Sequence, residues 1–244
     1  MMNRQERKYI VREQTGKGEP KALAEQQEIL ANKLNFASQE AYKLLRTNLM
    51  FSTCDEEKCK IIGLTSALRG EGKSTTAINL SYVLAEANKK TLLIEADMRL
   101  PRIQRLLQFQ ETVGLSNVLA GVNKLEEAIR RGVFWDTLSI LPSGEIPPNP
   151  SELLSSMKMK HILSTLAEDY DYIIIDLPPI TAVSDGLAIS TLLSDMIVVV
   201  RPDYCDRHAL ADTMRQMEFL NVKILGFVMN CRGQKRRKRK KYEY

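Results

Sequence analysis

Short runs of aliphatic and β-branched residues alternate with longer amphipathic stretches over most of this chain, and this alternation limits the folds that it can adopt. The apolar runs have the length and composition of buried strands, and they lie at 60–65, 91–97, 138–141, 172–179, 196–200 and 222–230. Helices are predicted between them, at 74–88, 102–109, 115–131, 151–168, 185–193 and 206–220. Strands joined through helices return parallel to one another by right-handed crossovers. The pattern therefore predicts an α/β fold with a doubly wound, mainly parallel sheet.

The chain divides by composition into one long globular region and two polar ends. Its 244 residues, of which 44% are hydrophobic, suffice to bury the core of a single domain, which we place at 36–230. Residues 1–35 are polar and predict a flexible N-terminal arm, and residues 231–244 predict a flexible C-terminal tail. No window approaches the ~18 apolar residues of a membrane span. We therefore expect a cytoplasmic chain whose membrane contact is at most peripheral.

The excess of basic charge is concentrated in the tail. The sequence holds 35 Lys and Arg against 30 Asp and Glu, and residues 232–244 supply eight of the cations with one of the anions. The remaining body carries 27 cations and 29 anions, which is an ordinary globular surface. We therefore expect no nucleic-acid partner. The four cysteines lack the paired spacing of a zinc site, so we expect reduced thiols.

The strongest motif is "GEGKST", which follows the first predicted strand and opens a helix. It resembles the end of a phosphate-binding loop, although Ala67 stands where the usual motif begins with glycine. Glycines let backbone N–H groups turn toward phosphate oxygens, Lys73 is long enough to reach the β- and γ-phosphates of ATP, and the Ser74 hydroxyl is a ligand for Mg²⁺. The alternative, a glycine turn beside a surface lysine, is disfavoured by the flanking strand and helix. The predicted nucleotide-binding residues are Gly70, Glu71, Gly72, Lys73, Ser74 and Thr75.

Acidic residues close two further predicted strands. "YIIID" ends in Asp176, which resembles the Walker B aspartate that holds Mg²⁺ in nucleotide-binding proteins. "LLIEADMR" delivers Glu95, Asp97 and Arg99 to the end of another strand. Parallel strands bring their carboxyl ends to one edge of the sheet, where ligands bind. We predict Mg²⁺ ligands at Ser74, Asp97 and Asp176; acids that only cap strand-end loops are the alternative.

These motifs together resemble one known family. "ALRGEGKST", "LLIEADMRLPR", "IIIDLPP" and "GEIPPNPSELL" are similar to segments of the bacterial tyrosine kinases that govern capsule and exopolysaccharide synthesis, in particular the stand-alone cytoplasmic type of Gram-positive bacteria. The resemblance runs from about residue 39 to residue 230. It implies a P-loop NTPase fold and an ATP-dependent protein tyrosine kinase that phosphorylates its own C-terminal tyrosines, in trans within a ring, and regulates polysaccharide synthesis and export.

The same resemblance implies roles for individual residues. The family's second motif is Asp-x-Asp-x-Arg, and Glu95 stands at its first position with one methylene more than aspartate. Asn230 follows the last predicted strand, where related ATPases contact adenine, and so it is implied as a nucleotide contact. The implied catalytic residues are Lys73, Glu95, Asp97, Arg99 and Asp176.

A predicted helix near the start of the domain carries a second family feature. "EAYKLLR" is similar to the family's Glu-x-x-Arg-x-x-Arg oligomerisation motif, with Glu40 and Arg46 retained and Lys43 in place of the middle arginine. The resemblance implies a ring of identical subunits joined through this helix. Lysine cannot reproduce the two-pronged contact of arginine, so we expect a weaker or differently bonded assembly. An ordinary solvated helix face would also place charges at this spacing.

The tail "KRRKRKKYEY" combines a run of cations with two tyrosines. The resemblance implies that Tyr242 and Tyr244 are the phosphoacceptors, and that the partners are a transmembrane adaptor of the polysaccharide co-polymerase type and a cognate phosphotyrosine phosphatase. A basic segment is also attracted to anionic lipid, so we expect the kinase at the inner face of the cell membrane. The alternative is that these cations only keep the tail extended and soluble.

Two other functions compete with the kinase. One is a positioning ATPase of the ParA/MinD type, but those proteins carry an extra lysine early in the phosphate loop, and the matching position here is Leu68. The other is a nucleotide-dependent, non-catalytic scaffold in a polysaccharide assembly machine, which is compatible with Glu95 and with a cluster of only two tyrosines. The appearance of phosphotyrosine in the purified protein separates the kinase from both.

Overall fold

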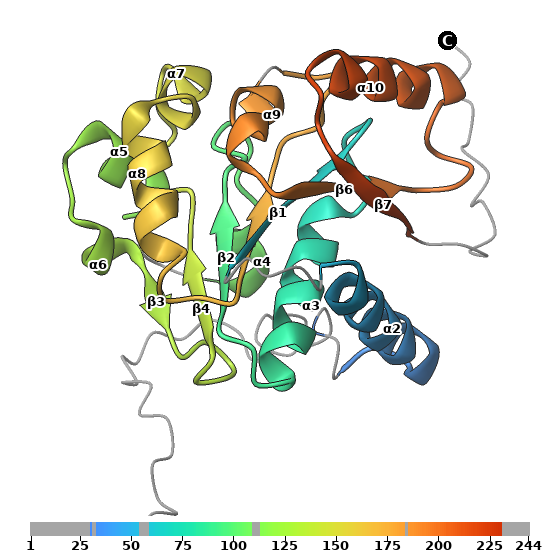
Figure 1. The fold of residues 1–244 in the computed structure, drawn as a ribbon, viewed down its shortest axis with the longest axis horizontal. Coiled ribbons are helices and arrows are strands. Elements are labelled where there is room, and N and C mark those ends of the chain that lie inside the picture. Colours follow the sequence, from blue (N-terminus) through green and yellow to red (C-terminus); the bar gives the residue numbers. More distant parts are fainter. Residues whose placement is uncertain (1–29, 31–32, 54–58, 109–112, 184, 231–244) are drawn as a thin grey trace, which may run out of the picture.

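The fold is built on one seven-stranded sheet with helices on both faces (Figure 1). The computed structural model describes residues 30, 33–53, 59–108, 113–183 and 185–230, so most of the predicted N-terminal arm and the whole tail from 231 lie outside the described residues. The strands are β1 (Lys60–Ser66), β2 (Thr91–Glu95), β3 (Arg130–Arg131), β4 (Leu138–Leu141), β5 (Tyr172–Asp176), β6 (Asp195–Val200) and β7 (Ile224–Met229).

The order of the strands confirms the doubly wound prediction. Across the sheet they run β3-β4-β2-β5-β1-β6-β7, and every neighbouring pair is parallel except β3 with β4. The central strand β1 lies between β5 and β6, so the chain winds outward from it in both directions. This arrangement creates a switch point at the carboxyl ends of the central strands, where open α/β sheets bind ligands.

Helices fill the connections between these strands, and several are shorter than the sequence predicts. The helices are α2 (Phe36–Ser52), α3 (Lys73–Glu86), α4 (Ile103–Leu107), α5 (Leu115–Ala120), α6 (Leu125–Ala128), α7 (Pro150–Leu154), α8 (Met157–Leu166), α9 (Asp185–Ala188) and α10 (Arg207–Phe219), with a 3₁₀ turn at Ser190–Leu192. Within the described residues, no helix has the length and apolar character needed to cross a membrane.

The helix predicted at 115–131 is wrong in extent, because Gly121 ends it early. Gly121 adopts φ 82°, the left-handed conformation that terminates helices, and caps α5 at Ala120. The chain resumes as the single turn α6 and then forms β3, a short antiparallel edge strand that the sequence pattern did not indicate. The helix predicted at 151–168 is likewise divided, since the Ser156 side chain accepts a hydrogen bond from Met159 N and starts α8 anew.

Two apolar layers enclose the sheet, because its central strands are buried on both faces. Alternate residues of one strand join opposite layers: Leu92 and Ile94 pack in the layer that contains α5 and α8, and Leu93 packs in the layer that contains α2 and α3. Full burial of each such side chain is worth about 1.5–3 kcal/mol. This rigid centre holds the strand ends, and the loops that follow them, in fixed positions.

Candidate active site

The phosphate-binding loop joins the end of β1 to the start of α3. Gly70 and Gly72 have φ 84° and 93°, values that side chains disfavour. A Cβ atom at Gly72 would also lie 1.8 Å from the side-chain nitrogen of Asn230. No side chain caps the first turn of α3, so its backbone N–H groups remain available to an anion at the positive end of the helix. Ser74 and Thr75 in this turn both line the adjoining pocket.

Four hydrogen bonds brace this loop, three of them from residues that follow β6 and β7. The carboxylate of Glu71 is buried and accepts hydrogen bonds from the backbone N–H of Leu68 at 2.7 Å and of Arg201 at 3.1 Å. Asn230 Nδ2 donates to the Glu71 carbonyl at 2.8 Å, and the Tyr204 hydroxyl donates to the carbonyl of Arg69 at 2.8 Å. The side chain of Glu71 therefore stabilises the loop from inside, and its backbone remains the part predicted to meet the nucleotide.

Lys73 lies between two carboxylates. Its Nζ donates to Oδ2 of Asp97 at 2.9 Å and lies 3.7 Å from Oδ1 of Asp176, and all three side chains are buried. Burial by itself would lower the pKa of Lys73, but the charges of Asp176 and Asp97 outweigh that effect and raise the pKa above its ordinary value. The lysine is therefore a permanent cation in the cavity that the phosphate loop encloses.

Asp176 is the side chain that best fits a bound metal ion. It is fully buried, and neither of its oxygens has a hydrogen-bond partner among the described residues. Burial raises its pKa, and the charge of Lys73 and the nearby Ser74 hydroxyl offset this only in part. A buried carboxylate without hydrogen-bond partners, close to the Ser74 hydroxyl, is the donor set that Mg²⁺ takes beside nucleotide phosphates. Asp97 fits less well, since its other oxygen accepts from Leu100 N at 3.2 Å.

Glu95 holds the segment that follows β2. Its Oε1 accepts from the backbone N–H groups of Arg102 at 2.5 Å and Ile103 at 2.6 Å, and its Oε2 accepts from Ser143 N at 3.3 Å. Burial raises the pKa of Glu95, and these N–H donors counteract the rise. Both oxygens of this side chain are therefore engaged with backbone, and the extra methylene allows the carboxylate to reach α4. A catalytic role for Glu95 stays a prediction.

Arg99 is held by an aspartate that the sequence analysis missed. Its Nε and Nη2 donate to the two oxygens of Asp185, at 2.7 and 3.1 Å, and the Ser151 hydroxyl donates to the same carboxylate. Burial would raise the pKa of Asp185, but the hydrogen bonds from Arg99 and Ser151 lower it. The signal in the sequence was weak, since Asp185 is a lone acid about nine residues after Asp176. The fork fixes Arg99 at the edge of the pocket.

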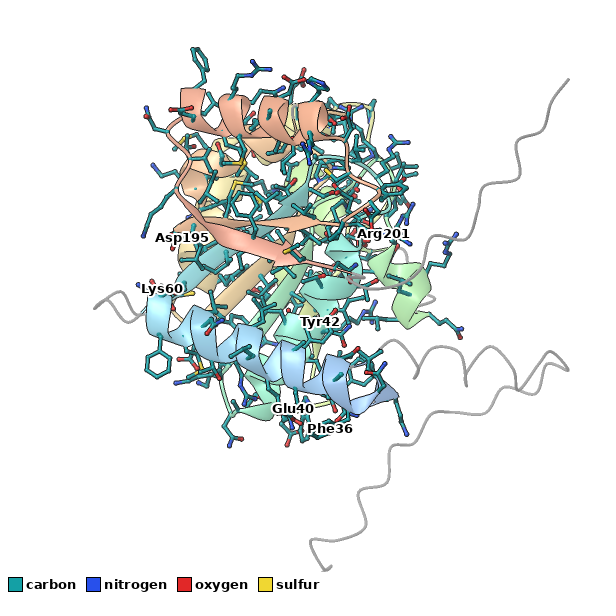
Figure 2. All side chains as sticks on the ribbon, turned by 90° about the vertical axis from the view of Figure 1, so that its right-hand side faces the viewer. Phe36, Glu40, Tyr42, Lys60, Asp195 and Arg201 are labelled. Carbon is teal, nitrogen blue, oxygen red and sulfur yellow. The ribbon has the colours of Figure 1, made fainter. Side chains whose placement is uncertain are left out.

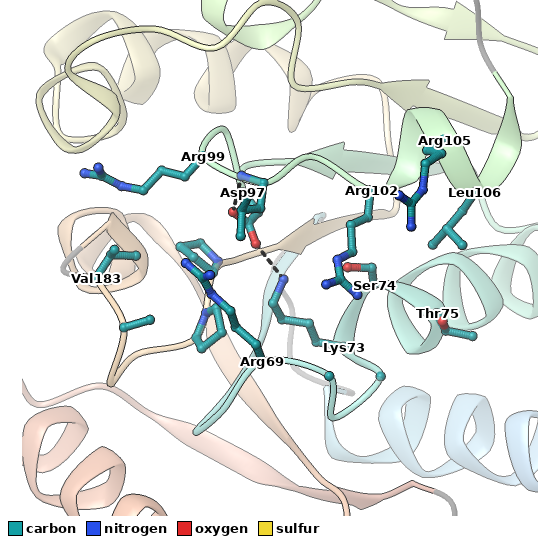
Figure 3. Close-up of a pocket in the computed structure, with 16 residues that line it drawn as sticks. Arg69, Lys73, Ser74, Thr75, Asp97, Arg99, Arg102, Arg105, Leu106 and Val183 are labelled. Atoms are coloured by element: carbon teal, nitrogen blue, oxygen red, sulfur yellow. Dashed lines mark hydrogen bonds and ion pairs between the residues drawn. The ribbon is translucent and has the colours of Figure 1, made fainter. Parts of the chain in front are cut away.

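Figure 3 shows the pocket that these elements enclose, with Lys73 and Asp97 joined at its centre. The phosphate loop and the start of α3 form one side, and the segment from Asp97 through α4 forms the other. Three further arginines also line it, and they are Arg69, Arg102 and Arg105. The structure thus brings Lys73, Ser74, Asp97 and Arg99 to one cavity, with Asp176 at 3.7 Å from Lys73.

The residues predicted for assembly lie on α2, on another side of the molecule. Glu40 and Lys43 are exposed and form a 2.9 Å ion pair with each other. Arg46 instead turns to α3 of its own chain, where it donates to the Val83 carbonyl at 2.8 Å and lies 3.5 Å from the Glu86 carboxylate. Figure 2 shows Glu40 on this helix, beneath the edge of the sheet formed by β7.

Comparisons with known proteins find relatives that cover most of this chain. A sequence-family model described as an AAA domain matches residues 59–224. The tyrosine-protein kinase YwqD of Bacillus subtilis (strain 168) is 38% identical over 205 residues, which are 84% of this chain and 85% of that protein.

Two solved structures have similar folds. The kinase domain of the Escherichia coli tyrosine kinase ETK superposes with a TM-score of 0.78 at 29% identity and covers 98% of this chain and 89% of that one. The septum site-determining protein MinD complexed with Mg-ADP, from Pyrococcus horikoshii OT3, has a TM-score of 0.61 at 29% identity over 72% of this chain and 71% of that one.

Proposed function

Because this chain belongs to the family of bacterial tyrosine-protein kinases, we propose that it transfers the γ-phosphoryl group of ATP to its own tail tyrosines in the control of capsule or exopolysaccharide synthesis. The observation that carries the proposal is the position of Lys73, which follows the phosphate loop and lies within 4 Å of carboxylates from the ends of two strands. This is the arrangement that a nucleoside triphosphate and its metal ion require.

Binding of the nucleotide falls to the loop and the start of α3. The backbone N–H groups of the loop and Lys73 would hold the β- and γ-phosphates. Asn230, whose Nδ2 donates to the Glu71 carbonyl of the loop, would contact the base. Ser74 and Asp176 would hold Mg²⁺, which when bound supplies charge neutralisation for the transferred group. The fit rests on the two oxygens of Asp176, which are buried without hydrogen-bond partners among the described residues.

The transfer itself needs positioning more than covalent chemistry. The phenolic oxygen of the tyrosine attacks the γ-phosphorus, a new O–P bond forms, and the bond from that phosphorus to the bridging oxygen breaks to release ADP. Since free tyrosine has a pKa of about 10, its proton leaves during the transfer rather than before it. Asp97 is the acceptor for this proton: when Lys73 turns toward phosphate, the Oδ2 that it now occupies becomes free.

The acceptors proposed are Tyr242 and Tyr244, which lie outside the described residues. Transfer in trans would require neighbouring subunits, and the exposed ion pair of Glu40 and Lys43 on α2 is available for such a ring. Arg46 supports α2 from within its own subunit. A transmembrane adaptor would bring the kinase to the inner face of the cell membrane and stimulate it, and a phosphotyrosine phosphatase would reset it.

A positioning ATPase is the second candidate, favoured by the likeness to MinD with Mg-ADP. The full chain incubated with ATP and Mg²⁺, alone and with the cytoplasmic segment of the adaptor, separates the two functions. We expect phosphotyrosine in the wild type, stimulation by the adaptor, and loss of signal in the Tyr242→Phe/Tyr244→Phe variant, which keeps six of the eight tyrosines. If ATP is hydrolysed but no phosphotyrosine forms, either with or without the adaptor, the result would exclude the kinase function and favour the positioning ATPase.

A further inference from the structure

Arg102 has no role in the site so far, yet its side chain enters it. Arg102 immediately precedes α4 and lines the pocket. Figure 3 shows its guanidinium extending from the start of α4 toward Ser74 and Lys73, on the side where the phosphate loop turns into α3. Among the described residues, no ion pair engages Arg102. This exposed cation is therefore available to a ligand in the pocket.

The backbone of Arg102 is fixed more firmly than its exposure suggests. Glu95 Oε1 accepts from its N–H at 2.5 Å and from that of Ile103 at 2.6 Å. Glu95 and Ile103 are both fully buried, and Ile103 packs in the apolar layer beneath α3. The backbone at Arg102 is thus fixed to β2 through the Glu95 carboxylate and to the core through Ile103. Binding of a ligand therefore costs little conformational entropy in the backbone at this position.

The negative charge of a nucleotide bound at the loop would be stabilised by a cation in the position of Arg102. Lys73 is already matched by Asp97 and Asp176, so this lysine alone does not neutralise the phosphates of a bound nucleotide. A triphosphate adds several more negative charges. Arginine also matches phosphate oxygens with two parallel N–H donors.

We propose that Arg102 is a further phosphate-binding residue of this site, which contacts the terminal phosphoryl group of ATP, and that Glu95 is the positioning residue that aims it. The proposal rests on the nucleotide site of the proposed function and not on the identity of the acceptor. Arg102 makes and breaks no covalent bond; its guanidinium stabilises the charge on the oxygens of the group in transfer.

Binding affinities for two nucleotides test the proposal without any turnover. Titration calorimetry with Mg²⁺ and either the non-hydrolysable β,γ-imido analogue of ATP or ADP gives the preference for a third phosphate. In the full chain, Arg102→Ala should weaken the triphosphate about 10- to 100-fold and ADP by less than about threefold, because one charge-assisted contact to the terminal phosphate is lost. Arg102→Lys should recover only part of the affinity, since it keeps the charge but loses the fork.

Two other arginines control for simple loss of charge. Arg131 lies exposed in β3, at the far edge of the sheet, and Arg131→Ala should leave both affinities unchanged. Arg105 lines the same pocket two residues into α4. Equal losses of triphosphate affinity in Arg105→Ala and Arg102→Ala would assign the effect to diffuse charge at the rim and overturn the proposal, as would an unchanged affinity in Arg102→Ala.

The role of Glu95 is tested by coupling it to Arg102. Glu95→Asp shortens the side chain by one methylene and so withdraws the carboxylate from the N–H groups that it holds. In the wild type, Arg102→Ala should reduce the preference for the triphosphate over ADP. In the Glu95→Asp background, the same substitution should reduce that preference by a factor at least threefold smaller. A merely structural role of Glu95 would leave that factor unchanged. If Glu95→Asp does not fold, Glu95→Gln serves, because its amide oxygen can still accept those two bonds and the full effect of Arg102→Ala should persist. A reduced effect in Glu95→Gln would refute the positioning role.

The outcome also separates this proposal from the kinase assignment. If the preference for the triphosphate depends on Arg102 and no phosphotyrosine forms, the phosphate-binding role of Arg102 would be supported and the kinase function would be excluded. If phosphotyrosine forms and Arg102→Ala leaves the preference for the triphosphate unchanged, the kinase function would be supported and the role of Arg102 would be excluded.

Discussion

Lys73 donates a hydrogen bond from Nζ to Oδ2 of Asp97 across 2.9 Å, and this bond joins the first residue of α3 to the loop after β2. The same nitrogen lies 3.7 Å from Asp176, so one buried cation is shared by two buried carboxylates. A phosphate group competes with both of them for the lysine. Binding of ATP and exposure of a proton acceptor on Asp97 are thereby coupled through a single side chain.

Replacing Lys73 should therefore affect stability as well as activity. Lys73→Met removes a phosphate contact and leaves Asp97 and Asp176 buried without their cation. We expect loss of tyrosine phosphorylation and a free energy of unfolding lower by about 3–5 kcal/mol at neutral pH, the usual cost of breaking a buried ion pair on one side. Urea unfolding and anti-phosphotyrosine blotting measure the two effects.

A double variant separates these effects. Lys73→Met combined with Asp97→Asn removes one of the two unmatched charges, so it should regain part of the stability and none of the activity. Undiminished phosphotyrosine in Lys73→Met would contradict the proposed role of the lysine.

Asp176 gives the free protein a pH dependence of a specific sign. Burial raises its pKa above the ordinary 3.8, so the folded chain binds the proton more tightly than the unfolded chain. As pH rises from about 3.8 through the folded pKa, this group lowers the free energy of unfolding by up to about 1.4 kcal/mol per pH unit. Asp176→Asn should remove that contribution, and the variant should be more stable than the wild type at pH 7.

The same substitution should abolish Mg²⁺-dependent transfer, because the amide is a poor substitute for a carboxylate ligand. Urea unfolding between pH 4 and pH 8 measures the stability of both proteins. Parallel curves for wild type and Asp176→Asn would show that the carboxyl titrates alike in the folded and unfolded chains, contrary to this prediction.

The fold was predictable because its cause is local and repeated. A parallel strand that is buried on both faces needs a continuous apolar run, and each crossover needs a helix. The run of isoleucines from Ile173 to Ile175 therefore predicts a buried strand, which the structure contains as β5. The phosphate loop was predictable for a similar reason, since Gly70 and Gly72 adopt backbone conformations that other residues disfavour.

The partners of individual side chains were not predictable in this way, because they come from distant segments. Asp185 reaches Arg99 from 86 residues away in sequence, and Arg46 reaches Val83 from 37 residues away. Glu95 was interpreted through the aspartate that it replaces, whereas its extra methylene brings it to the backbone of Arg102. Spacing shows which residues share a sheet edge, but hydrogen-bond partners depend on the packing of loops.

The pair of Arg99 and Asp185 should contribute stability above the ordinary pKa of the aspartate. Because the pKa of Asp185 is lowered in the folded chain, the stabilisation is present above about pH 3.8 and disappears as pH falls through the folded value. Asp185→Asn should lower the free energy of unfolding by about 1.5–3 kcal/mol at pH 7, as for a lost hydrogen bond between charged groups.

Ser151→Ala is the matched control, since it removes one hydrogen bond to Asp185 and leaves both bonds from Arg99. It should cost about 0.5–1.5 kcal/mol. Urea unfolding from pH 7 downward should show the gap between wild type and Asp185→Asn closing below pH 3.8. A gap that does not depend on pH would argue against the ion pair as its source.

Substitution of Glu40 should impair assembly of the ring, whereas substitution of Arg46 should lower the stability of the subunit. Glu40→Lys reverses an exposed charge on α2 and breaks only a surface pair with Lys43, so the free energy of unfolding should change by less than about 0.5 kcal/mol. If the ring forms through this helix, light scattering should show monomers and autophosphorylation should fall. Arg46→Ala loses its bond to Val83 within the subunit and should lower stability by about 1–3 kcal/mol.

These two variants separate assembly from folding on the same helix. A Glu40→Lys protein that keeps the oligomeric state of the wild type would exclude this face of α2 from the interface. A wild type that is monomeric at all concentrations and still phosphorylates itself efficiently would exclude the ring.

The tail at 235–244 should bind anionic membranes in a way that its own phosphorylation reverses. Its seven consecutive cations each contribute about 1 kcal/mol at an anionic inner leaflet. Two phosphotyrosines, at about −1.5 to −2 charges each, would cancel about half of that local charge and add repulsion beside Glu243. Co-sedimentation with vesicles that contain phosphatidylserine should therefore recover the unphosphorylated chain, and much less of the phosphorylated chain or of a chain truncated after Asn230. Equal recovery of all three proteins would mean that the cations serve only to keep the tail soluble.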